Sequence, residues 1–130
     1  AAAGLPVPGD MQGKNALGVL AGNTPTGWRT DMYYRYYHYP ADHRVQPHIG
    51  VRTLTHKLIH FNKIDQWELY DLTTDPRETR NLISEPGKQT MVAELKSRMM
   101  ALKKELGDED QFADKVPPGG VDGQPAKRPQ

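Results

Sequence analysis

The chain contains no cysteine, so its 130 residues can form no disulfide, no thiolate nucleophile and no cysteine-ligated metal site. It also lacks an apolar stretch long enough to span a bilayer, and it shows no signal peptide. Because the sequence begins with Ala1 rather than Met, we expect a processed product or a piece of a longer protein.

A strong net charge is absent as well. The 17 basic and 16 acidic side chains leave a formal net charge of +1, which gives no overall attraction to nucleic acid or to an anionic membrane. Hydrophobic residues make up only 36% of the chain, whereas 12 glycines and 11 prolines are present. We therefore expect one small domain with a single core, and part of the chain outside that core.

The two ends of the chain have little that could form a core. Residues 1–27 are rich in Ala, Gly and Pro, and we expect one short helix among them, over residues 16–21. Residues 107–130 are acidic and then rich in Pro and Gly. We expect them to form a disordered tail that begins with a solvent-exposed acidic run from Asp108 to Asp110.

Residues 28–72 favour β-strands. Residues 28–39 carry β-prone aromatics on both faces, which is typical of a strand that is covered on both sides. After a polar loop, residues 48–61 predict a second strand, bent near Thr55. Residues 66–72 follow a turn and predict a third strand.

Residues 73–106 predict helices. Asp75, Pro76 and Glu78 suit the cap, first and third positions of a short helix. A longer helix should follow, because apolar side chains recur at alternating spacings of three and four residues: Val92, Leu95, Met99, Leu102 and Leu106. This apolar stripe should lie across one face of the sheet, which gives an α+β fold.

The five histidines suggest a metal site by their number, but their positions argue against one. His56 and His60 lie on a predicted strand, where residues four apart are about 13 Å from each other and cannot share one ion. We therefore expect these two to be ordinary sheet residues. His43 and His48 flank the polar loop at a strand end, where binding residues often collect, so they are candidates for ligand contact.

Residues 33–53 gather five of the six tyrosines and three arginines, a composition that could stack the bases of a nucleic acid. No RNP-like motif accompanies them, and the small net charge argues against a groove that follows phosphates. A sheet packed by tyrosines with hydrogen-bonded hydroxyls explains the same residues. No catalytic triad or phosphate-binding glycine loop is present, so the residues alone define a small α+β domain of unknown role.

The order of three stretches resembles the C-terminal end of sulfatases that act on sulfated sugars. These stretches are residues 10–40, 48–61 and 67–82. The third is the most specific, because it holds Glu-Leu-Tyr-Asp-Leu followed by Asp-Pro, and the second holds Gly-Val-Arg-Thr and Lys-Leu-Ile. The resemblance covers roughly residues 4–106, which is most of the chain.

The resemblance implies a small antiparallel sheet of three to four strands with a C-terminal helix across one face. This sheet would dock on a large alkaline-phosphatase-like catalytic domain, which would partly cover the second face of the tyrosine-rich strand. Residues 1–27 would be the end of the catalytic domain and a linker, residues 28–106 the C-terminal subdomain, and residues 107–130 the disordered tail. The implied partners are that catalytic domain and a sulfated carbohydrate, in a secreted or periplasmic enzyme, with neither nucleic acid nor membrane among them.

The resemblance also places the loop over residues 40–48 at the substrate pocket. His48 and His43 would hydrogen-bond a sugar hydroxyl. Arg44 would meet a carboxylate or sulfate through two parallel hydrogen bonds, as its planar guanidinium allows.

Catalysis in sulfatases needs groups that this chain lacks. The family uses a formylglycine made within Cys/Ser-x-Pro-x-Arg, and it binds calcium through acidic and amide oxygens. Residues 84–88, Ser-Glu-Pro-Gly-Lys, mimic the motif but end in Lys and lie just before the long helix, so we expect no function for them. Formylglycine and calcium are implied only for the complete enzyme, and this chain should not hydrolyse sulfate esters alone. An alternative is a free-standing carbohydrate-binding module that kept the sheet and stacks its aromatics on sugar rings.

In isolation, the chain should self-associate or keep its first 27 residues mobile. Both the tyrosine face and the apolar residues of the short helix, such as Leu17 and Leu20, would lack a cover, and exposed apolar patches drive association. Light scattering during size-exclusion chromatography measures the first outcome, and backbone NMR relaxation measures the second. A monomer at high concentration with an ordered N-terminal segment would contradict this prediction.

Overall fold

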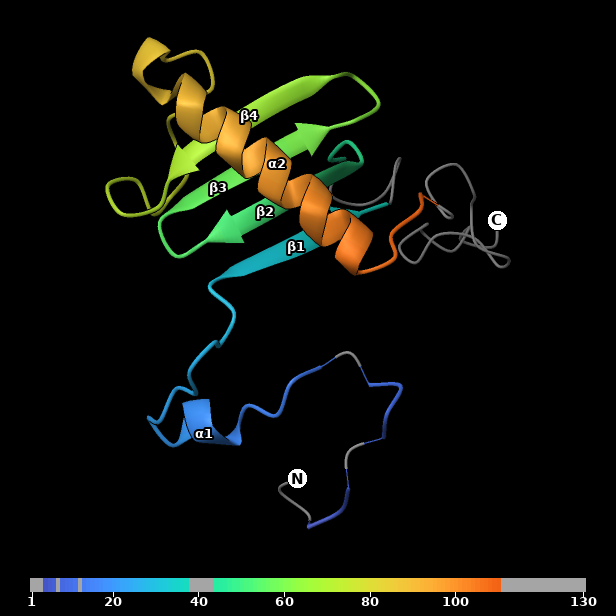
Figure 1. Cartoon of the computed structure of the whole chain (residues 1–130). Helices are drawn as coiled ribbons and strands as arrows, with labels where there is room; N and C mark the ends of the chain where they lie inside the picture. Colours follow the sequence, from blue (N-terminus) through green and yellow to red (C-terminus); the bar gives the residue numbers. More distant parts are fainter. Residues whose placement is uncertain (1–3, 7, 12, 38–43, 111–130) are drawn as a thin grey trace, which may run out of the picture.

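The structure is a computed structural model, and it describes residues 4–6, 8–11, 13–37 and 44–110. Figure 1 shows a sheet with one long helix across it, which confirms the expected α+β class. The elements in chain order are α1 (Leu17–Leu20), β1 (Asp31–Tyr36), β2 (His48–Thr53), β3 (His56–Phe61), β4 (Gln66–Asp71), the 3₁₀ helix η1 (Pro86–Lys88) and α2 (Gln89–Glu105). None of the helices in these described segments is long and apolar enough to cross a membrane.

The four strands form one antiparallel sheet in the order β1-β2-β3-β4. The predicted single strand over residues 48–61 is wrong, because β2 and β3 form a hairpin. The Thr53 hydroxyl accepts hydrogen bonds from the backbone N–H groups of Thr55 (3.2 Å) and His56 (2.9 Å), which turns the chain at this point. A threonine that bonds its own backbone in this way ends the strand and fixes the hairpin.

The core lies between the sheet and α2 (Figure 1). The strand register puts Tyr33, Val51, Leu58 and Leu69 in one row across the face below the helix. The three aliphatic members of that row are fully buried. The helix contributes the first four residues of the predicted stripe, namely Val92, Leu95, Met99 and Leu102.

The last residue of the stripe is wrong, since Leu106 is 44% exposed. Leu106 is the C-cap of α2, and Gly107 adopts a positive φ of 66° directly after it. The N–H of Gly107 donates to the carbonyl of Lys104, and that of Asp108 donates to the carbonyl of Lys103. This is the Schellman arrangement, which ends the helix and reverses the chain direction.

The predicted acidic run is solvent-exposed only in part, because the chain reversal brings Asp108 onto the sheet. The side chain of Asp108 is only 11% exposed and lies against Arg35 of β1, whose side chain is 6% exposed. Asp110, in contrast, is about half exposed. The expectation of a solvated Asp108 is therefore wrong, and the rest of the expected tail, residues 111–130, lies outside the described residues.

The short helix predicted to begin at Asp75 is also wrong. The Asp75 carboxylate accepts the backbone N–H groups of Thr79 (2.7 Å) and Arg80 (2.9 Å), and Glu78 adopts a positive φ of 55°. The Glu78 carboxylate then pairs with Lys57 at 2.6 Å. Side-chain bonds to the backbone, and an ion pair between this loop and β3, thus replace the helical hydrogen bonds that the sequence pattern favoured.

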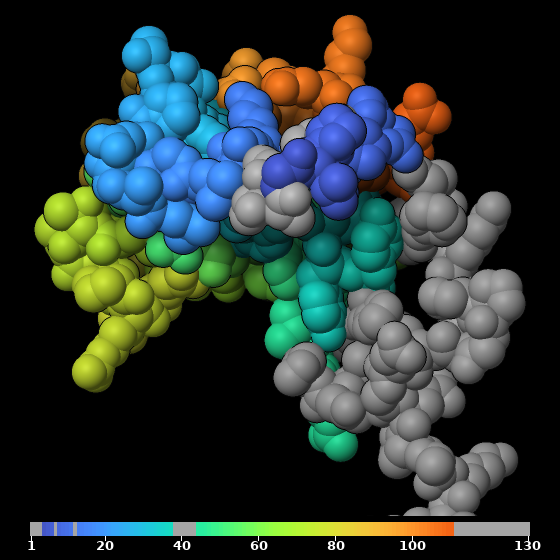
Figure 2. Space-filling view, turned by 90° about the horizontal axis from the view of Figure 1, so that it is seen from below, coloured from blue at the N-terminus to red at the C-terminus, as the bar shows by residue number. Residues whose placement is uncertain are grey.

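The N-terminal segment lies apart from the sheet (Figure 1). Its helix α1 falls inside the expected range of residues 16–21, and Leu20 on it is 83% exposed. Viewed from the β1 edge, this segment lies in front of the sheet edge and α2 lies to one side (Figure 2). No described helix packs on the sheet face opposite α2, which we call the open face. It carries the side chains of Met32, Tyr34, Tyr36, His48, Arg52, Lys57, Ile59, Phe61, Gln66, Glu68 and Tyr70.

Gly50, at the centre of the open face, should not tolerate a side chain. A Cβ added at Gly50 would lie 2.4 Å from Cζ of Tyr34, whose ring covers the glycine. Gly50→Ala should therefore lower the free energy of unfolding by about 1–3 kcal/mol, measured by urea denaturation.

Gly87→Ala is the matched control, because a Cβ there would have no heavy atom within 4 Å. The cost of Gly50→Ala should also shrink in a Tyr34→Ala background, where the overlapping ring is absent. An equal cost in both backgrounds would contradict the proposed overlap.

Candidate functional site

The predicted binding residues belong to the end of the sheet where β1 leads into β2. His48 is the first residue of β2, and it pairs with Tyr36, the last residue of β1. Arg44 precedes it on the connecting loop, where it is exposed and has a positive φ of 49°. His43 lies outside the described residues.

Three aromatic rings surround His48 on the open face. The Tyr36 ring stacks on the imidazole with centroids 5.3 Å apart and planes inclined by 22°. Tyr34 meets it edge-on at 5.9 Å, and Phe61 of β3 lies at 5.2 Å. Such contacts orient the ring in a part-buried position. The two-residue spacing of Tyr34 and Tyr36 places them on one face of a strand, but no signal in the sequence pairs them with His48.

A hydrogen bond fixes the protonation pattern of the neutral His48 ring. Nδ1 lies 2.9 Å from the carbonyl oxygen of Gln46. A carbonyl oxygen can only accept, so Nδ1 carries the proton and Nε2 keeps a lone pair. In this form His48 can accept a hydrogen bond from a hydroxyl group through Nε2, and its protonated form could donate to an anion instead.

The other half of the open face carries charged and phenolic groups. Tyr70 donates to Glu68 at 2.9 Å, and burial together with this contact raises the pKa of Tyr70 to about 12. The Tyr34 hydroxyl is inaccessible to water and bonds to none of the described residues. Burial and the nearby carboxylates of Glu78 and Glu68 raise the pKa of Tyr34 well above its usual value. Arg52 is exposed beside these groups.

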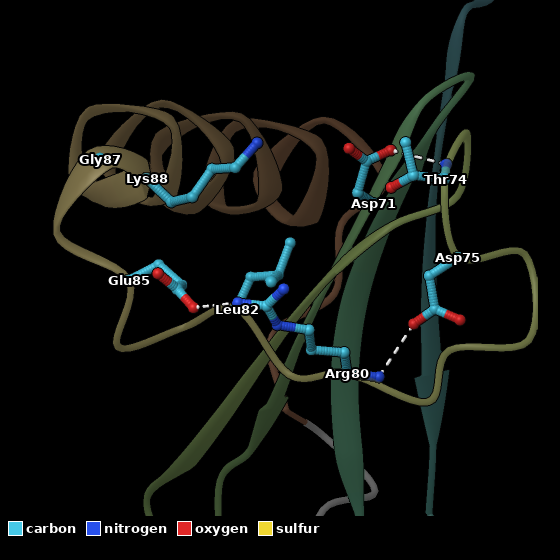
Figure 3. A pocket seen from close by; sticks show the side chains of 8 residues that line it. All are labelled: Asp71, Thr74, Asp75, Arg80, Leu82, Glu85, Gly87 and Lys88. Carbon is cyan, nitrogen blue, oxygen red and sulfur yellow. Dashed lines mark hydrogen bonds and ion pairs between the residues drawn. The ribbon is translucent and has the colours of Figure 1, made fainter.

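A separate cavity of about 360 Å³ lies at the far end of β4 from His48 (Figure 3). Its polar groups mostly bind one another. The Asp75 carboxylate accepts the N–H of Arg80, which lowers the pKa of Asp75, and the Arg80 guanidinium pairs with Glu85 at 2.6 Å. Three of its lining residues, Glu85, Gly87 and Lys88, belong to the Ser-Glu-Pro-Gly-Lys stretch. That stretch leads through η1 into α2, in agreement with a structural role.

His56 and His60 have partners on β4 or in the adjoining turns. His60 stacks on Trp67 at 3.9 Å, and its Nε2 lies 3.0 Å from the Asp65 carboxylate. Nδ1 of His56 lies 2.9 Å from the Thr55 hydroxyl. Within residues 4–6, 8–11, 13–37 and 44–110, no three metal-ligating side chains come together.

Comparison with known proteins identifies the family. Residues 1–105 match the model of the C-terminal domain of N-sulphoglucosamine sulphohydrolase. The chain belongs to this sulfatase family. It is 44% identical over 111 residues to an N-acetylglucosamine-6-O-sulfatase of Bacteroides thetaiotaomicron, and the match covers 83% of the chain but 20% of the relative. The chain thus spans about a fifth of the length of this curated sulfatase.

Solved structures agree with this assignment. One, a protein in complex with its substrate D-glucosamine-2-N,6-O-disulfate, is 41% identical with a TM-score of 0.77 and covers 87% of this chain and 24% of its own. A putative sulfatase from Bacteroides thetaiotaomicron and a 2-O GAG sulfatase, each 24% identical, have TM-scores of 0.73 and 0.72 and cover 95% and 87% of this chain. These two share the fold of the sulfatase C-terminal domain.

In this sulfatase domain, the neutral His48 ring should be protonated at Nδ1. His60 provides an internal control with the opposite pattern, because its Nε2 faces a carboxylate that can only accept. Two-bond ¹H–¹⁵N correlation spectra of the ¹⁵N-labelled chain, recorded above the titration range of both histidines, distinguish the two forms. Protonation of His48 at Nε2 would contradict the hydrogen bond to Gln46.

Proposed function

We propose that this chain is the C-terminal domain of a sulfatase that hydrolyses sulfate esters of carbohydrates, and that it forms one wall of the substrate cleft. The observation that carries the proposal is the constrained His48 ring at the sheet end, with its Nε2 lone pair left unused by the Nδ1 hydrogen bond. A relative that is 44% identical is an N-acetylglucosamine-6-O-sulfatase, and a solved relative is bound to a disulfated glucosamine. Both support a sulfated amino sugar as the substrate class.

The three predicted residues contact different groups of such a sugar. His48 accepts a hydrogen bond from a sugar hydroxyl through Nε2. The exposed Arg44 offers a planar, permanently charged group that can bind two oxygens of a sulfate or carboxylate at once. His43, next to Arg44 in the sequence, supplies a further hydrogen bond to the sugar.

The open face docks on the catalytic domain of the same enzyme. It combines partly exposed aromatic side chains with Met32, which is 48% exposed. Such a face suits contact with protein better than contact with water. The catalytic domain is the natural occupant, because the chain accounts for only 20% of its curated relative. Arg52 then meets an acidic group of that domain.

The bond-breaking groups belong to the catalytic domain. Formylglycine formation needs a Cys or Ser followed by x-Pro-x-Arg, which this sequence lacks, and the described residues bring no acidic cluster together for calcium. Under this proposal, sulfate release requires the catalytic domain in addition to this chain. The complete enzyme is secreted or periplasmic, as the resemblance to carbohydrate sulfatases implies.

The gene upstream of the Ala1 codon should encode, in frame, a Cys/Ser-x-Pro-x-Arg motif and acidic calcium ligands. The full-length protein should then release sulfate from 6-O-sulfated glucosamine, whereas this chain alone should not. His48→Ala in that protein should raise KM roughly threefold to tenfold, as expected for one lost hydrogen bond, with a smaller effect on kcat.

His60→Ala is the matched control, since that histidine is bonded within the sheet and should leave KM unchanged. Equal KM values for His48→Ala and wild type would reject the role of His48. A stop codon just upstream, with glycan binding by the chain itself, would favour a free-standing carbohydrate-binding module instead.

A further inference from the structure

β1 is an edge strand of the described sheet, and α2 together with the turn that follows α2 holds β1 at both ends. It pairs with β2 on one side only. At its beginning, Asp31 forms an ion pair with Arg98 of α2. At its end, Arg35 forms an ion pair with Asp108, which directly follows the turn that ends α2. An edge strand that lacks a second neighbour depends on contacts of this kind for its position.

The pair at the end of β1 is the more buried of the two. The Arg35 and Asp108 side chains are 6% and 11% exposed, whereas Arg98 is 45% exposed. Oδ2 of Asp108 accepts hydrogen bonds from Nε of Arg35 at 2.6 Å and from the hydroxyl of Tyr33 at 2.5 Å. Loss of the Asp108 charge would leave a buried guanidinium without its main partner, which is costly.

Electrostatics keep Asp108 charged in this position. Burial alone would raise its pKa, but the hydrogen bonds from Tyr33 and Arg35 outweigh burial and hold the pKa below its usual value. A second carboxylate, Asp110, binds both the Arg35 guanidinium and the ammonium of Lys103 on α2. The guanidinium of Arg35 is therefore held by two acidic residues that follow the helix.

The same end of β1 supports the binding residue. Arg35 is adjacent to Tyr36, whose ring stacks on His48 at 5.3 Å and whose backbone pairs with His48 in the sheet. Arg35 itself pairs with Ile49, the next residue of β2. A displacement of Arg35 would move Tyr36 with it and would remove the ring that orients the imidazole.

We infer that Asp108 is a positioning residue for sugar binding. It fixes Arg35 and Tyr33, so that Tyr36 keeps the His48 ring in the orientation that accepts a sugar hydroxyl. Asp108 itself touches no substrate. This inference rests on the proposed function only in its last step, because the effect of Asp108 on the Tyr36–His48 contact can be measured without any substrate.

The first experiment compares Asp108→Asn with Asp31→Asn in the chain by NMR. Both substitutions remove one carboxylate charge from an ion pair of β1, but only Asp108 lies at the end that carries Tyr36. We expect Asp108→Asn to weaken the ring-to-ring NOE between Tyr36 and His48, and Asp31→Asn to preserve it. An unchanged NOE in Asp108→Asn, or an equal loss in both variants, would overturn the inference.

If Asp108→Asn does not fold, Tyr33→Phe replaces it in this experiment. The Tyr33→Phe substitution removes one hydrogen bond to Asp108 and keeps the aromatic ring. We expect the same loss of NOE, smaller in size. Asp108→Glu keeps the carboxylate and should restore part of the contact. A normal NOE in Tyr33→Phe, in the absence of a folded Asp108→Asn variant, would reject the positioning role.

The second experiment measures kinetics in the full-length protein. Asp108→Asn should raise KM for the sulfated sugar by roughly threefold, with kcat nearly unchanged, and Asp31→Asn should leave both unchanged. If His48→Ala raises KM and Asp108→Asn does not, the positioning inference fails while the proposed function stands. If His48→Ala leaves KM unchanged, the proposed role of His48 fails, and the NMR comparison still decides the structural part.

Discussion

The burial of one sheet face by α2 is the constraint on which the rest of the structure depends. Val51, Leu58, Leu69 and Met99 are the fully buried side chains of this contact, and they come from three strands and the helix. Each contributes roughly 1.5–3 kcal/mol before the entropy of folding is counted, so a single layer of this size leaves little stability to spare. The apolar core therefore uses α2, the one long helix among the described residues, and no described helix covers the second face of the sheet. One face of the sheet thus forms the core of this domain, and the other face is available for contacts outside that core.

The register of the sheet decides what that second face offers. Because side chains alternate along a strand, the row that buries Tyr33 under α2 also directs Tyr34 and Tyr36 to the open face, beside His48. A slip of one residue in β1 would exchange these sets and place the stacked tyrosine in the core. Gly50 helps to fix this register, since the Tyr34 ring occupies the space that a side chain at position 50 would need. The position of the candidate binding residue is thus a consequence of core packing on the other side of the sheet.

Local patterns predicted the parts of the structure that depend on local interactions. The helical stripe from Val92 to Leu102 follows from its spacing, and the sulfatase resemblance followed from the order of short motifs. Sequence reasoning failed wherever a distant side chain decided the outcome. Asp75 had the pattern of a helix start, but Glu78 pairs with Lys57 of β3 and the chain turns instead. Asp108 had the pattern of a solvated acid, but its partners lie more than seventy residues earlier in the sequence. The neighbours of His48 could not be predicted, because they depend on the pairing register of the strands, and neither composition nor residue spacing gives that register.

Two kinds of force hold the sheet to the helix, and they act at different strands. β2, β3 and β4 contact α2 mainly through apolar side chains, whereas β1 is joined to α2 and its C-terminal turn by charged groups at both ends. The pKa of Asp31 is lowered by its hydrogen bond from Arg98, and that of Asp108 is lowered by Tyr33 and Arg35 against the effect of burial. Apolar contacts are tolerant of small shifts, while a buried ion pair requires a defined geometry. The strand that carries the aromatic neighbours of His48 is therefore positioned by the more directional of the two forces, which gives the candidate binding residue at the start of β2 a defined surrounding.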